Sequence, residues 1–195
     1  LGKQVDYQDI YTEGITKITK TDIEYAKALH ASIKLLGTSK WEDDGKIYSM
    51  VAPFMIDSDH PLGHVNGVFN GIFVNGNMLG DTMFYGKGAG KLPTASAVVA
   101  DVVDAVKHQG TNIMTIWEQD KVELGDRANF ACRFFVRVAD TTSKETVEKI
   151  FGEVEYVTLA DVSGEYAFLT DKLTEGAFEE KSKQVDMIMR IRTAL

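Results

Sequence analysis

The order of apolar and amphipathic runs in residues 128–195 constrains the fold more than any other feature of the chain. The run FACRFFVRV alternates apolar and polar positions in its second half, as strands do, and SKETVEKIFG opens with Ser143, a favourable helix cap. Two further strand-like runs, a helical run and a last strand-like run follow. This order, βαββαβ, is typical of the ferredoxin-like arrangement. We therefore predict an α+β fold, although many unrelated binding modules share it.

The single cysteine of the chain, Cys132, lies in the first of these strands. Because no second cysteine is present, it cannot form a disulfide within the chain. The alternation places it with apolar neighbours, and free cysteine behaves as a small buried hydrophobe. We predict a core position for Cys132, on the face formed by Phe130, Phe134, Val136 and Val138.

The first half predicts a helix followed by strands. We expect a helix from a cap at Thr21 to Gly37, with His30 on its apolar face as a packed core histidine. Strands are expected around 38–41 and over 46–56, where Pro53 indicates an edge or a bulge. The run GVFNGIFVNGNMLGDTMFYG then predicts a β-hairpin around its Asn-Gly step.

A glycine-rich turn, GKGAG, separates this hairpin from a helix expected between Pro93 or Thr94 and Gly110. Glycines at a helix N-terminus allow the backbone to approach an anionic or polarised ligand group. The dinucleotide fingerprint would need glycine in place of Lys91, and a P-loop would need Ser or Thr in place of Leu92. The pattern therefore leaves two interpretations open, a structural turn and a ligand contact.

Charge argues against nucleic acid and membrane surfaces as partners. The chain has a formal charge of -8, and residues 128–195 hold 9 basic and 12 acidic residues, a net of -3. No basic stripe is present that could follow a phosphate backbone or an anionic bilayer. The sequence shows neither a long apolar run nor a secretory signal pattern, so we expect a cytoplasmic protein.

Four successive segments resemble homoserine dehydrogenases over about residues 5–107. They are YTEGITKIT, DIEYAKALHASIKLLG, HPLGHVNGVFNGIFV and MFYGKGAGKLPTASAVVADVVD. The resemblance implies an oxidoreductase that interconverts L-homoserine and L-aspartate 4-semialdehyde with NAD or NADP, in the biosynthesis of threonine, methionine and isoleucine. In that family the glycine loop lines the nicotinamide side of the cofactor site. This implies cofactor contacts at Gly90 first, then at Gly88, Ala89 and Gly86.

The resemblance begins after the family's dinucleotide-binding domain, its acidic substrate residues and its catalytic lysine. The chain starts at Leu1 rather than at a methionine, so we expect the C-terminal part of a longer enzyme, inactive alone. No catalytic residue and no metal ligand is assigned. His60 could exchange a proton, but a turn cap is favoured. Exposed positions are expected for Lys17, Lys20, Lys87 and Lys91.

Residues 128–195 resemble a degenerate ACT domain, the regulatory module that ends many of these enzymes. Asp140 to Ser143 stand where the usual loop reads Asp-x-Pro-Gly, which puts amino-acid binding by this loop in doubt. We expect residues 1–110 to end the catalytic domain, 111–127 to form a linker, and 128–195 to form the ACT-like domain. Homoserine as substrate, threonine as a possible effector, and a homodimer or homotetramer are implied. The alternative is an amino-acid-binding or oligomerisation module without catalysis.

Overall fold

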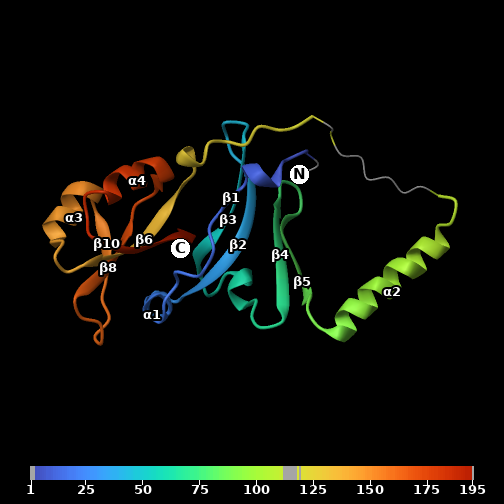
Figure 1. Cartoon of the computed structure of the whole chain (residues 1–195), viewed down its shortest axis with the longest axis horizontal. Coiled ribbons are helices and arrows are strands. Elements are labelled where there is room, and N and C mark those ends of the chain that lie inside the picture. The colour runs from blue at the N-terminus through green and yellow to red at the C-terminus, as the bar shows by residue number, and fades with distance from the viewer. Residues whose placement is uncertain (1–2, 112–117, 119, 195) are drawn as a thin grey trace. The chain divides into compact units, whose positions relative to one another are not determined.

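The computed structural model describes residues 3–111, 118 and 120–194, and it forms two compact units. The first, here called the hairpin unit, comprises residues 59–118. The second, called the sheet unit, combines residues 3–58 with residues 119–195. Figure 1 shows the chain coloured from its N-terminus to its C-terminus.

The sheet unit is built on one mixed sheet of eight strands. The strand order is β1-β3-β10-β6-β8-β7, with β2 beside β3 and β9 beside β6. Parallel pairing joins β3 to β1 and to β10, and the other pairs are antiparallel. The strands are β1 (Tyr11–Thr12), β2 (Ala31–Trp41), β3 (Ile47–Asp57), β6 (Ala131–Ala139), β7 (Val154–Val157), β8 (Glu165–Thr170), β9 (Leu173–Thr174) and β10 (Met187–Ala194).

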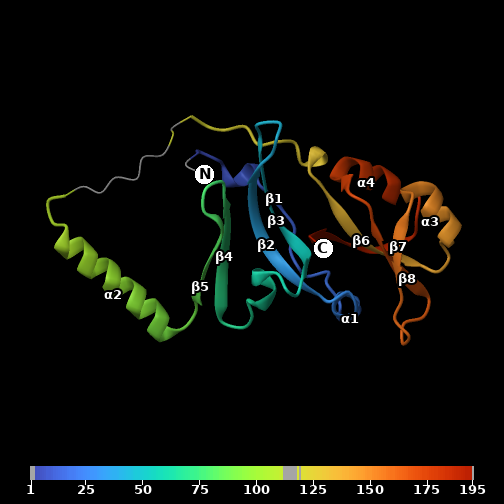
Figure 2. The ribbon, with the colours of Figure 1, turned by 180° about the vertical axis from the view of Figure 1, so that it is seen from behind.

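The predicted order βαββαβ is present in residues 131–194. Its helices are α3 (Lys144–Phe151) and α4 (Glu175–Ser182), and its strands lie in the order β10-β6-β8-β7. Both helices cover the same side of β6 and β8, as Figure 2 shows from behind. Their core contains Cys132, which is 8% exposed, beside Phe134 and Val136, so its predicted core position is confirmed.

The sheet continues from this half into the N-terminal segment. Arg192 of β10 pairs with Phe54 of β3, and alternate β6 residues such as Phe135 pack with Tyr25 and Met55 in a second core. The compact unit that contains the C-terminal half therefore also contains residues 3–58. The predicted boundaries, by contrast, divide the chain into 1–110, 111–127 and 128–195. Those boundaries stay a prediction, and the predicted linker falls partly outside the described residues.

The helix predicted from Thr21 to Gly37 is shorter in the structure. Helix α1 (Lys20–Ala28) is capped by Thr19, whose hydroxyl and backbone form a capping box with Asp22. It ends before His30, whose φ of +52° breaks the helix, and β2 begins at Ala31. Residues 31–41 pair along all of β3, and this long-range pairing outweighs the local helical pattern. His30 is exposed, so its predicted core position is wrong.

Strand β3 as a whole has neighbours on both sides, but at Pro53, where an edge or a bulge was predicted, one side has no strand partner. On one side β2 runs along the whole of β3. On the other side β1 pairs with Met50 and Val51, and β10 pairs from Phe54 onward. Pro53, which lacks a backbone N–H, lies in the gap between these two partners.

The hairpin unit contains η2 (Pro61–His64), β4 (Phe69–Gly76), β5 (Gly80–Lys87) and α2 (Lys91–Lys107). The predicted hairpin is confirmed by the antiparallel pairing of β4 with β5. Helix α2 begins at Lys91, slightly earlier than predicted, and buries none of its residues. No helix within the described ranges is both long and apolar enough to cross a membrane.

Candidate functional site

The glycine-rich turn connects β5 to α2 and presents the helix N-terminus. Gly90 is the N-cap residue, with φ +117° and ψ 150°, a backbone conformation that residues other than glycine rarely adopt. No side chain in the described part of the chain caps the first turn of α2. Its N–H groups and the positive end of its dipole are therefore available to a negative or polarised group.

Two other glycines of the turn differ in how closely they are packed. A Cβ atom on Gly88 would collide with the side-chain amide nitrogen of Asn70, so a side chain at Gly88 would require the Asn70 side chain to move. A Cβ atom on Gly86 would meet nothing within 4 Å. Gly86 and Gly88 line a shallow hollow of about 500 Å³ on the hairpin, to which Ala89 and Gly90 do not contribute.

His60 has a structural place in the hairpin unit. It is the N-cap of η2, and its Nδ1 accepts a hydrogen bond from the backbone N–H of Leu62 at 3.1 Å. Its ring packs on Phe73 with 4.8 Å between the ring centres. The structure therefore supports the turn-cap interpretation, with the ring nitrogen capping an N–H rather than a carbonyl.

The lysines that we left without a catalytic role are exposed, as predicted. Lys20 pairs with Glu24 one turn along α1, and Lys87 lies 5.6 Å from the ring centre of Phe69. Lys17 and Lys91 are exposed as well. None of the four lysines is in a buried environment.

Sequence reasoning did not identify a buried ion-pair network in the sheet unit. Arg192 is fully buried and contacts both Glu175, also fully buried, and Glu13, at 2.8 Å. Glu175 further accepts a hydrogen bond from Arg127 at 2.9 Å. A second pair of contacts holds Arg137 between Asp22 and Glu165, each at 2.6 Å. The only signal in the sequence is the alternation in MIMRIRTA, which places two arginines among apolar residues.

Burial and charge act in opposite directions within this network. Burial alone would raise the pKa of Glu13, but the hydrogen bond from Arg192 and the charges of Arg190 and Arg192 lower it overall. The carboxylate is therefore the stable form. At Cys132 the balance is the reverse: burial, aided by the charge of Glu175, outweighs the opposing charges of Arg192 and Arg190 and raises the thiol pKa to about 12.

Comparison with known proteins identifies the family. The family model described as homoserine dehydrogenase matches residues 1–103. A homoserine dehydrogenase of Pseudomonas aeruginosa is 46% identical over 106 residues, which are 54% of this chain and 24% of that protein. One of Helicobacter pylori is 35% identical over 149 residues, which are 76% of this chain and 35% of that protein.

Solved structures extend the likeness to nearly the whole chain. A homoserine dehydrogenase from Thiobacillus denitrificans superposes with a TM-score of 0.79 at 25% identity, covering 96% of this chain and 48% of that one. The Staphylococcus aureus enzyme gives 0.73 at 30% identity, with 97% and 48% covered. The chain thus spans about half the length of these structures and a smaller share of the curated relatives. On this likeness, and on the family match over residues 1–103, the chain belongs to the homoserine dehydrogenase family.

Proposed function

We propose that this chain forms part of an NAD(P)-dependent homoserine dehydrogenase that interconverts L-homoserine and L-aspartate 4-semialdehyde. The observation that supports it best is the turn at Gly90, a helix N-terminus without a side-chain cap whose backbone conformation favours glycine, within the segment matched by the family. The turn would contact the cofactor, through Gly90 first and through Gly88, Ala89 and Gly86 beside it.

The residues present fit this role. A side chain at Gly88 or Gly90 would collide with Asn70 or strain the backbone, so the turn offers bare peptide groups. The nicotinamide supplies the hydride chemistry when it is bound. The chain's own contribution is to position and polarise it, by backbone N–H groups at the start of α2.

The catalytic groups of the reaction are proposed to lie outside these 195 residues. We assign no lysine, histidine or carboxylate of this chain to proton transfer, and the 195 residues alone should be inactive. The exposed valines of α2 support a larger assembly, because such an apolar face is normally covered. These are Val98, Val99, Val102, Val103 and Val106.

The C-terminal half is proposed to be an ACT-like domain that mediates pairing in a cytoplasmic homodimer or homotetramer. Binding of threonine by its first loop is the second candidate function. Several polar atoms of the loop already have partners, since Thr142 Oγ accepts from the Asp186 N–H and the Thr142 carbonyl accepts from the Tyr166 hydroxyl. Ser143 Oγ caps α3. These contacts argue against effector binding at this loop.

The test is reduction of NAD or NADP on adding L-homoserine. The 195-residue chain is assayed beside a polypeptide extended with the upstream half of a family member. We expect activity only in the longer polypeptide. Within it, Gly90→Ala should raise KM for the cofactor about tenfold or more, since a misplaced peptide group loses a hydrogen bond to a polarised group.

Gly76→Ala serves as the matched control. Gly76 ends β4 of the same hairpin, and a Cβ there meets only an ordinary contact at 3.8 Å. Its KM should stay unchanged. Absence of homoserine-dependent reduction in the longer polypeptide would refute the proposed activity.

A further inference from the structure

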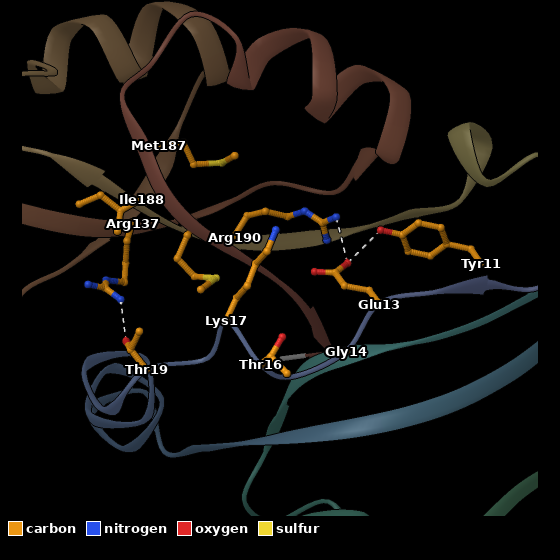
Figure 3. A pocket seen from close by; sticks show the side chains of 11 residues that line it. Tyr11, Glu13, Gly14, Thr16, Lys17, Thr19, Arg137, Met187, Ile188 and Arg190 are labelled. Atoms are coloured by element: carbon orange, nitrogen blue, oxygen red, sulfur yellow. Dashed lines mark hydrogen bonds and ion pairs between the residues drawn. The ribbon is translucent and has the colours of Figure 1, made fainter.

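A cavity of about 710 Å³ lies in the sheet unit, away from the glycine-rich turn. It is located where the partner of β3 changes from β1 to β10, so the segment after β1 and the first half of β10 form its two sides. Figure 3 shows the side chains that enter it from both segments. The ones used below are Glu13, Thr16, Lys17, Arg137, Met187 and Arg190.

The charged groups that line this cavity are unequal in number. Three cations face one carboxylate, Glu13, whose charge is already shared. Its Oε2 accepts hydrogen bonds from Arg192 at 2.8 Å and from the Tyr11 hydroxyl at 3.1 Å, and it forms an ion pair with Arg190 Nη2 at 3.1 Å. Glu13 therefore has little capacity to neutralise another cation.

Two of the cations have unused binding capacity. Lys17 makes no ion pair with any described residue, and its side chain rises from the lower segment into the cavity in Figure 3. Arg190 pairs with Glu13 through Nη2, but its Nη1 is buried and has no hydrogen-bond partner among the residues that the structure describes. A buried guanidinium nitrogen without a partner is unfavourable, so this donor favours an added acceptor. Arg137 differs because Asp22 and Glu165 already hold it.

The other residues that line the cavity indicate which kind of anion it would bind. Thr16 adds a hydroxyl, while Met187 and its neighbours Ile188 and Met189 add apolar surface. Apolar walls with a few convergent polar groups suit a small organic molecule better than a bare inorganic ion. Two cations with free donors suit two carboxylate groups on a short chain.

We propose that this cavity binds a small dicarboxylate, one carboxylate on Lys17 and the other on Arg190 Nη1. The site lies in the sheet unit, and none of residues 140–145 lines it, so it is separate from both the cofactor turn and the ACT-type loop. The ligand would join the N-terminal segment to β10 and stabilise the sheet unit by binding only the folded state.

The experiment titrates the full 195-residue chain with succinate by calorimetry, and with uncharged succinamide as the matched ligand. We expect succinate to bind, with an affinity that falls as salt is added, and succinamide not to bind. Lys17→Gln should weaken succinate binding about tenfold or more, because it removes a charge-assisted hydrogen bond. The exposed position of Lys17 means that this change should leave folding intact.

Lys20→Gln is the control variant, since it removes the same charge from an exposed position that does not line the cavity. Its succinate affinity should equal that of the unmodified chain. The proposal is overturned if succinate does not bind, if succinamide binds equally well, or if both lysine variants weaken binding to the same extent. None of these results bears on homoserine dehydrogenase activity.

Discussion

Replacing Glu175 by glutamine tests the buried ion-pair network most severely. Glu175 and Arg192 are both 0% exposed, and Glu175 also binds Arg127. Removing one member of a buried pair costs about 3–5 kcal/mol, because the remaining charge stays desolvated. Arg192 would keep Glu13, which is 28% exposed, so we expect the lower end, about 3 kcal/mol.

The assay is urea unfolding followed by circular dichroism, with Glu179→Gln as the control. Glu179 also pairs with Arg127, at 2.7 Å, but its side chain is 47% exposed. Exposed pairs contribute about 0–1 kcal/mol, so the control should lose no more than that. A loss below about 1 kcal/mol for Glu175→Gln, or equal losses for both variants, would refute the reasoning.

Three further predictions concern single residues of the sheet unit. The pKa of Glu13 is lowered from 4.5 on folding, so its stabilisation is complete above pH 4.5 and is lost as the pH falls through the folded-state value. In the Glu13→Gln variant the free energy of unfolding should therefore fall less steeply as the pH is lowered. An unchanged dependence at acid pH would contradict this. Cys132, with its thiol pKa near 12, should react with a disulfide reagent far more slowly in the native chain than in denaturant; equal rates would disprove its burial. Ser143→Ala removes the N-cap of α3 and should cost about 1 kcal/mol in thermal or urea unfolding, whereas no loss would exclude the capping role.

Local patterns predicted the elements whose partners are close in sequence. The alternation in FACRFFVRV correctly placed Cys132 in the core, and the Asn-Gly step correctly placed the hairpin of β4 and β5. The order βαββαβ also followed from local patterns, since the spacing of apolar residues differs between strands and helices. Gly90 could be singled out because glycine has a distinct conformational role at a helix start.

Features that depend on distant partners could not be predicted in this way. Residues 31–36 look helical by themselves, but they form a strand because β3 pairs with them. The contact between Glu13 and Arg192 joins residues that are 179 positions apart, so no local sequence pattern predicts it. The same holds for the cavity lined by Lys17 and Arg190, which exists only because β1 and β10 meet along β3.

The turn at Gly90 is proposed to contact the nicotinamide cofactor. The most direct test is the dissociation constant of NADPH, measured by fluorescence on the extended polypeptide that includes this chain. Gly90→Ala should raise that constant about tenfold or more relative to the unmodified protein, while Gly76→Ala leaves it unchanged. Equal NADPH affinity in the Gly90→Ala protein, with its fold intact by circular dichroism, would contradict the account.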